Sequence, residues 1–172
     1  MNIHNKTIEY EKLLNKSLDR KIGLCWGGFD FLHAGHILHF KFTKKYCQTL
    51  IVAINSDQAF PDKGKGRPFF PEQERAEIIA SIDYVDYVVV YHGSYLNNQN
   101  SVGILHGKIQ TTPYVPIDII NKIKPDYYFK GIEYKGKSIP EIEIVQKNGG
   151  VIIYGPEEPV FSASQIIKSN NL

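Results

Sequence analysis

Residues 27–36 read Gly-Gly-Phe-Asp-Phe-Leu-His-Ala-Gly-His, and the fold that we expect follows from them. The apolar run 22–26 before it predicts a buried strand, and the pattern that starts near Gly35 predicts a helix. Glycine lets the backbone approach a ligand closely, and the free N–H groups at a helix start attract anions. His33 and His36 lie on one side of that helix because they are three positions apart. The stretch therefore predicts a polyphosphate site between a strand and a helix.

Apolar, β-branched-rich runs recur along the chain and alternate with helical patterns. We expect strands at 22–26, 50–54, 87–91, 127–130 and 151–154, and helices at 35–46, 71–81, 116–123, 140–147 and 164–170. This alternation predicts an α/β fold, a Rossmann-like doubly wound parallel sheet of about five strands with helices on both faces. Ligands of such sheets bind outside the carboxyl ends of the strands, where the strand order reverses. The histidine stretch follows the first strand and so falls where this rule places a site.

The length of 172 residues predicts a single domain over residues 1–172. Residues 1–20 are expected to form an N-terminal helical lead-in with a weak amphipathic pattern. Residues 92–112 carry an asparagine-rich run without periodicity, and we interpret them as an insertion loop. A loop of this length is usually functional or partly disordered.

Composition and charge exclude several classes of partner. The net charge is only +2, so that no broad basic face favours nucleic acid. No apolar run is long enough for a membrane span, and the first residues lack the apolar core of a signal peptide. The two unpatterned cysteines, Cys25 and Cys47, favour a reducing compartment, and we expect a cytoplasmic protein. The oligomeric state stays open, with a homodimer as the commonest arrangement.

The stretch 27–36 resembles the signature Gly-x-Phe-Asp-x-x-His-x-Gly-His of the cytidylyltransferase-like nucleotidyltransferases, and it matches every fixed position as far as His36. The resemblance implies transfer of a nucleoside monophosphate from ATP or CTP to a phosphorylated small-molecule acceptor. Pyrophosphate leaves, and Mg²⁺ accompanies the nucleoside triphosphate. In this family His33 and His36 would donate hydrogen bonds to the phosphates and stabilise the transition state.

A metal site is the alternative reading of the same helix, because His39 extends the histidine spacing by one more step. The glycine-rich context favours phosphate over metal, and we expect no metal ligands here. His39 is interpreted as a packing residue or an acceptor contact.

A second motif lies in residues 62–75, which read DKGKGRPFFPEQER. It is similar to the family's lysine-bearing loop followed by R-P-x-x-P-x-x-x-R. The resemblance implies that Lys63 or Lys65 reaches the phosphates or the acceptor, and Lys65 is preferred because it is nearer Arg67. The resemblance also implies that Arg75 braces the site. For the two lysines the alternative is a solvated charged loop, and for Arg75 it is a structural salt bridge.

Two further motifs are similar to family segments. Lys130-Gly131-Ile132-Glu133-Tyr134 resembles a strand-end loop in which an acidic residue accepts a bond from a ribose hydroxyl, with a simple strand-exit turn as the alternative. Residues 161–167 resemble the segment that starts the final helix and contacts the β- and γ-phosphates. An ordinary helix cap at Ser164 has equal weight there.

The candidate residues fall into three groups. The catalytic candidates are His33, His36, Lys65 and Arg75. The nucleotide-binding candidates are Gly27, Gly28, Phe29, Asp30, Gly35, Lys130, Gly131, Glu133, Ser162 and Ser164. The acceptor-binding candidates are Lys63, Arg67 and Asp57.

Within the family the chain looks most similar to the adenylyltransferases of heptose 1-phosphate, which implies a place in carbohydrate metabolism. Residues 53–57, Lys130-Gly131 and Asn148-Gly149-Gly150 carry that resemblance. Two departures, the insertion at about 93–110 and the pair Trp26-Gly27, are compatible with a different acceptor. A cytidylyltransferase acting on glycerol 3-phosphate or another alcohol phosphate is the first alternative. A non-catalytic nucleotide-binding module is the alternative of a different class.

Overall fold

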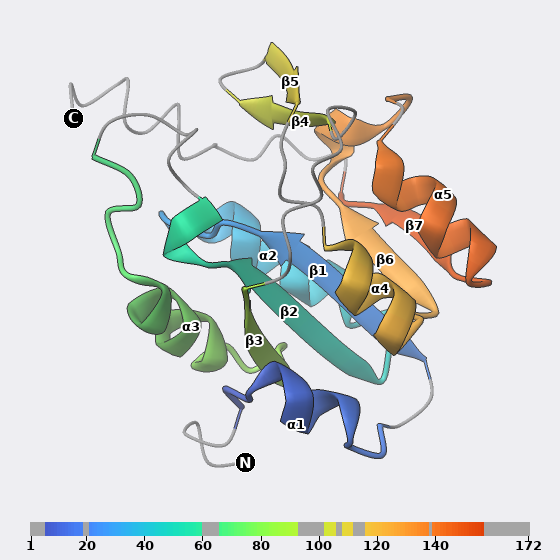
Figure 1. Cartoon of the computed structure of the whole chain (residues 1–172), viewed down its shortest axis with the longest axis horizontal. Coiled ribbons are helices and arrows are strands. Elements are labelled where there is room, and N and C mark those ends of the chain that lie inside the picture. Colours follow the sequence, from blue (N-terminus) through green and yellow to red (C-terminus); the bar gives the residue numbers. More distant parts are fainter. Residues whose placement is uncertain are drawn as a thin grey trace.

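The computed structural model describes residues 6–18, 21–59, 66–92, 102–105, 108–111, 116–137 and 139–156. Five parallel strands form its central sheet in the order β3-β2-β1-β6-β7 (Figure 1). They are β1 (Ile22–Gly27), β2 (Thr49–Asn55), β3 (Tyr87–Tyr91), β6 (Tyr127–Lys130) and β7 (Val151–Tyr154). The predicted α/β fold with about five parallel strands is confirmed, and each strand lies within one residue of its expected bounds.

The strand order reverses beside β1. The chain runs outward from β1 through β2 to β3, then crosses over to β6 and β7 on the other side. Leu24 of β1 consequently lies opposite Ile51 of β2 and Tyr128 of β6. The carboxyl end of β1 is therefore at the switch point, the place where sheets of this kind bind ligands.

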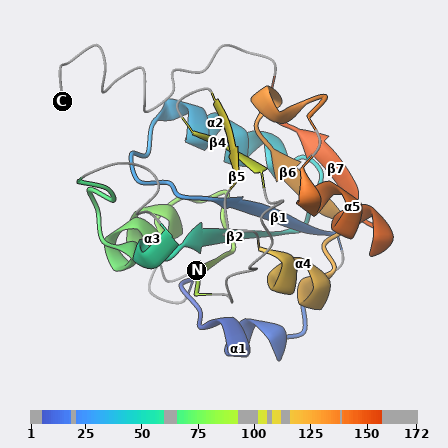
Figure 2. The ribbon, with the colours of Figure 1, turned by 45° about the horizontal axis from the view of Figure 1, so that its top comes forward.

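Helices cover both faces of the sheet and enclose two apolar cores (Figure 2). Helices α2 (Ala34–Thr43) and α3 (Glu72–Ala80) pack on one face, through residues such as Phe40 and Ile79. Helices α1 (Tyr10–Leu14), α4 (Ile117–Ile123) and α5 (Pro140–Lys147) pack on the other, through residues such as Leu13 and Val145. Burial on both faces explains why the strands are almost continuously apolar.

Helix ends differ from the expected bounds by a few residues. The helix expected to reach residue 46 ends at Thr43, and the chain continues there as a turn. Pro71 is the N-cap of α3 and not its first residue. Gly149 has a φ of 85°, a left-handed conformation that glycine adopts without strain, and it ends the α5 segment as expected.

The expected loop at 92–112 contains regular structure, so that the loop interpretation is wrong for part of it. Strands β4 (Val102–Leu105) and β5 (Lys108–Thr111) pair antiparallel, apart from the central sheet (Figure 1). Two short runs separated by His106-Gly107 are a hairpin signal in the sequence, and the neighbouring asparagines obscured it. Residues 93–101 of the insertion lie outside the described residues.

The N-terminal segment has a shorter helix than its pattern indicates. Helix α1 holds five residues, and before it Thr7 forms a parallel bridge to Val88 of β3. The amide of Ile8 donates to the Val88 carbonyl at 2.9 Å, which ties this segment to the edge of the sheet. The expected last helix at 164–170 lies outside the described residues.

Short 3₁₀ turns follow two of the central strands. They are η2 (Asp57–Ala59), after β2, and η4 (Ile132–Tyr134), after β6. No helix in the described parts of the chain is both long and apolar enough to cross a lipid bilayer.

Candidate active site

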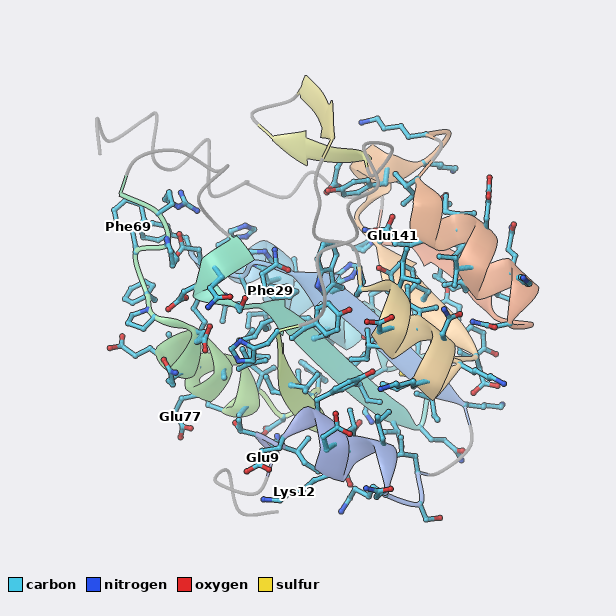
Figure 3. All side chains as sticks on the ribbon, in the orientation of Figure 1. Glu9, Lys12, Phe29, Phe69, Glu77 and Glu141 are labelled. Carbon is cyan, nitrogen blue, oxygen red and sulfur yellow. The ribbon has the colours of Figure 1, made fainter. Side chains whose placement is uncertain are left out.

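The loop between β1 and α2 is held by an unusual backbone conformation at Phe29. Its φ is 49°, in the left-handed region that residues with a side chain seldom occupy. The ring of Phe29 packs against the rings of His36 and Phe40, with centroids 5.3 Å and 5.5 Å away. Phe29, labelled in Figure 3, is partly buried and packs against the core on this face of the sheet. Burial of this ring compensates for the strain and fixes the path of the chain into α2.

The two predicted histidines meet at the start of α2. His33 is the N-cap, and its Nδ1 accepts the amide of Gly35 at 3.2 Å. The Nδ1 of His36 accepts the amide of His33 at 3.3 Å, so that the pair forms a reciprocal capping box. The ring centroids are 3.9 Å apart. Sequence reasoning predicted the pairing of the rings but not that they cap the helix.

These backbone contacts determine which nitrogen carries the proton. A neutral imidazole has one acceptor nitrogen and one donor nitrogen. Because both Nδ1 atoms accept backbone amides, both Nε2 atoms carry the hydrogen and can donate. The geometry therefore provides two N–H donors at a helix N-terminus, a suitable arrangement for binding phosphate oxygens.

Burial keeps both rings neutral. It lowers the pKa of His36 to about 3, and the neighbouring His33 and His39 act in the same direction. Burial also lowers the pKa of His33, and it lowers the pKa of His39 to about 4. A bound triphosphate would oppose these shifts, because nearby negative charge favours an imidazolium. Without nucleotide, both rings are therefore neutral imidazoles at pH 7, each with one N–H donor.

Asp30 of the motif supports the neighbouring loop. Its Oδ1 accepts the amides of Phe69 and Phe70 at 2.8 Å and 3.1 Å, and its Oδ2 pairs with Arg67 Nε at 2.5 Å. The Asp30 side chain is almost completely buried. Asp30 therefore holds the segment before α3 against the segment before α2, which sequence reasoning did not foresee.

Arg67 contacts two aromatic rings of the same region, the half-buried Phe31 and the exposed Phe69. Its guanidinium is 5.7 Å from the ring centroid of Phe31 and 5.1 Å from that of Phe69. Figure 3 shows Phe69 at the outer edge of the molecule. The ion pair with Asp30 and these ring contacts fix Arg67 in place, and its expected contact with the acceptor stays a prediction.

Arg75 is completely buried beneath the site and joins three segments. Its Nη1 donates to the carbonyls of Gly28 at 2.7 Å and Asn55 at 2.8 Å, and its Nε donates to the Phe70 carbonyl at 2.9 Å. Its Nη2 pairs with Asp57 Oδ1 at 2.6 Å. The salt bridge raised as an alternative is thus present. The same contacts let Arg75 brace the ends of β1 and β2, which carry the site.

Lys130 points into the protein, away from the solvent. Its Nζ donates to Glu141 Oε1 at 2.9 Å, and both side chains are buried. The carboxylate of Glu133 lies over the following Gly131, 2.2 Å from where a Cβ of that residue would be. Glu133 therefore folds back over the end of β6. Glu141 belongs to no recognisable motif, and only the structure identifies it as the partner of Lys130.

His39 has a packing environment. Its Nδ1 would lie 2.7 Å from a Cβ at Gly155, and its ring meets Phe40 and Phe129 edge-on. In the parts of the chain that the structure describes, no three histidine, cysteine or acidic side chains are grouped as metal ligands.

Four of the expected site residues lie outside the described residues. They are Lys63, Lys65, Ser162 and Ser164. Their roles stay predictions of the sequence.

The chain is similar in sequence to a known protein family and to curated proteins. Residues 24–168 match the family described as cytidylyltransferase-like. The bifunctional protein HldE of Aliarcobacter butzleri is 35% identical over 142 residues, covering 80% of this chain and 26% of that protein. HldE of Helicobacter pylori is 34% identical over 137 residues, covering 79% of this chain and 25% of that protein. The chain spans about a quarter of the length of these relatives.

Solved structures share the fold. The lipopolysaccharide core biosynthesis protein of Thermoplasma volcanium superposes with a TM-score of 0.56 at 24% identity, covering 80% of this chain and 98% of that one. Pantoate–β-alanine ligase of Francisella tularensis gives a TM-score of 0.57 at 18% identity, covering 93% and 73%. The chain belongs to the cytidylyltransferase-like family.

Proposed function

We propose that this chain transfers a nucleoside monophosphate from ATP or CTP to a heptose 1-phosphate-like sugar phosphate and releases pyrophosphate. The observation that carries the proposal is the pair of Nε2–H donors at the start of α2, directed by the amides of Gly35 and His33. The similarity to HldE proteins and the motifs at 53–57 and 130–134 support a sugar phosphate as the acceptor.

In the proposed mechanism the triphosphate lies along the start of α2, over the end of β1. An oxygen of the acceptor phosphate attacks the α-phosphorus in line with the departing pyrophosphate. The new phosphoanhydride bond forms as the bond from the α-phosphorus to the bridging oxygen breaks. His33 and His36 donate to the oxygens on which negative charge increases, and this stabilises the transition state. Arg75 acts indirectly, by holding the carbonyl of Gly28 and the end of β2.

Mg²⁺ would enter as part of the substrate. Among the described residues, the carboxylates nearest this loop are engaged in the protein: Asp30 accepts two amides, and Asp57 pairs with Arg75. Mg²⁺ is commonly held by substrate phosphates and water, and this arrangement suits a site without a free carboxylate cage. The ion would neutralise charge on the β- and γ-phosphates of the leaving pyrophosphate.

Pyrophosphate release tests the proposed function. ATP and CTP are each crossed with heptose 1-phosphate and glycerol 3-phosphate, and the coupled release of pyrophosphate is measured. We expect turnover with the sugar phosphate and one of the two nucleotides. Turnover with glycerol 3-phosphate alone would favour the alcohol-phosphate alternative. Tight nucleotide binding without turnover on any acceptor would favour a non-catalytic module.

A further inference from the structure

A cluster of aromatic and charged side chains surrounds Lys130 at the carboxyl end of β6. Its Nζ lies 4.7 Å from the ring centroid of Tyr134, 5.4 Å from that of Trp26 and 5.5 Å from that of Tyr128. The same ammonium pairs with Glu141, which Figure 3 shows at the start of α5. Lys130 is only 6% exposed, Glu141 3% and Tyr128 0%. Four elements, β1, β6, η4 and α5, thus converge on one buried charge.

Three polar atoms of this cluster are buried without a hydrogen-bond partner in the described part of the chain. They are Trp26 Nε1, Tyr128 Oη and Glu141 Oε2. Buried polar atoms in folded proteins nearly always have partners, and each exception calls for an explanation. The three atoms belong to side chains that surround the same ammonium, so that one cause can account for all of them.

The chemistry of the three atoms is complementary to a hydroxyl group. The indole N–H only donates, the carboxylate oxygen only accepts, and the phenol does both. A ligand hydroxyl can accept from Trp26 and donate to Glu141. Sugars supply several adjacent hydroxyls, and the apolar faces of their rings pack against aromatic side chains.

The cluster lies next to the proposed phosphate site. Trp26 directly precedes Gly27 at the end of β1, and Lys130 directly precedes Gly131 at the end of β6. These two strands flank the switch point of the sheet. Trp26 and Tyr134 are partly exposed, so that the cluster borders the surface at these two side chains.

We propose that Trp26, Tyr128 and Glu141 form a hydroxyl subsite, which binds the hydroxyl groups of a sugar held beside the triphosphate. Lys130 orients the Glu141 carboxylate through their ion pair. The inference rests on the proposed function, because the sugar is either the acceptor or the ribose of the nucleotide. Both share the same chemistry, and the test distinguishes them.

The substitution Tyr128→Phe tests the subsite by removing one hydroxyl and keeping the ring. In the free protein we expect no loss of stability, because the described part of the chain gives this hydroxyl no partner. Calorimetric titration should show the Kd for the sugar ligand rising about tenfold, the effect of one hydrogen bond. Tyr127→Phe is the control, because Tyr127 lies on the opposite face of β6. Trp26→Phe should weaken binding of the same ligand.

The titrations use ATP, CTP, 3′-deoxy-ATP and heptose 1-phosphate in turn. A weaker Kd for heptose 1-phosphate alone assigns the subsite to the acceptor. A weaker Kd for ATP or CTP, and not for the deoxynucleotide, assigns it to the ribose. Unchanged Kd values in Tyr128→Phe, or a clear loss of its stability without ligand, would overturn the subsite. Binding to the wild type without pyrophosphate release would overturn only the proposed reaction, and no binding of any of the four would overturn both.

Discussion

The side chains of His33 and His36 are oriented by the backbone, since each Nδ1 accepts an amide of the same short segment. The capping box that stabilises the start of α2 therefore also leaves the Nε2–H of each ring as its donor. Alanine at either position would remove a donor and a cap together. Glutamine keeps a polar side chain of similar length, and this helps to separate the two effects.

We expect His36→Ala to lower kcat by about 10²–10³-fold, the usual effect of removing one transition-state donor. The loss corresponds to about 3–4 kcal/mol of barrier. Steady-state pyrophosphate release measures it, with circular dichroism to verify folding. His92→Ala is the control, because His92 is an exposed histidine at the end of β3 that pairs with Glu72. Wild-type turnover in folded His36→Ala would contradict the proposed role.

Acid should weaken the fold through the buried histidines. In the folded state the pKa of His36 is about 3, whereas an unfolded histidine has a pKa of about 6.5. The unfolded chain therefore takes up protons first, and the free energy of unfolding falls as the pH drops below about 6.5. Above that pH this contribution is constant.

Urea denaturation at pH 7, 6, 5 and 4.5 checks this dependence. His36→Gln cannot take up the proton, so that its stability should fall less steeply with acid than that of the wild type. Glu143→Gln, an exposed change on α5, should keep the wild-type slope. Parallel curves for wild type and His36→Gln would show that the His36 ring is not held neutral by burial.

Among the elements, α3 acts as the clamp of the site. Its Arg75 joins the end of β1, the end of β2 and the segment before α3 through three backbone carbonyls. Helix α5 has a similar role on the other face of the sheet, where Glu141 accepts a hydrogen bond from Lys130. In both cases a buried charged side chain lies beneath a loop that the sequence predicted to contact the substrate.

We expect Arg75→Met to destabilise the protein by about 3 kcal/mol or more, because three backbone carbonyls and Asp57 lose their donor. The ion pair with Asp57 adds little, since the Asp57 side chain is 40% exposed. Chemical denaturation at pH 7 measures the change. Glu74→Gln, an exposed substitution on the same helix, should alter stability by less than about 0.5 kcal/mol. Equal stability of Arg75→Met and wild type would rule out the clamp.

The sequence predicted the elements well and their side-chain contacts poorly. The strands are continuous apolar runs between helical patterns. A parallel sheet that is buried on both faces requires such runs, so that they are visible in the sequence. The β4–β5 hairpin was missed because it is short and follows an asparagine-rich run. Motifs located His33, His36 and Gly35, whereas the inward direction of Lys130 and the loop contacts of Asp30 depend on residues far along the chain. Such partners leave no local pattern, and only the fold brings them together.

At the scale of the whole molecule, the strand order brings the site together. The segments after β1, β2 and β6 all emerge at one edge of the sheet, beside the point where the order reverses. A ligand bound there would contact several of these segments at once. Nucleotide binding should therefore stabilise the molecule as a whole.

We expect a nucleoside triphosphate with Mg²⁺ at a hundred times its Kd to raise the free energy of unfolding by about 2.7 kcal/mol. Urea denaturation with and without ATP or CTP measures the increase. The nucleosides adenosine and cytidine at the same concentration should stabilise much less, because they lack the phosphates. Equal stabilisation by the nucleoside and the triphosphate would mean that the protein recognises the base, and not the phosphates at the start of α2.

The most direct test of the account is a crystal structure with a non-hydrolysable analogue of the triphosphate. We predict its phosphates within hydrogen-bond distance of the Nε2 atoms of His33 and His36, with both Nδ1 atoms still on their backbone amides. A nucleotide bound at another edge of the sheet, or one bound with both imidazoles turned away from its phosphates, would contradict the account.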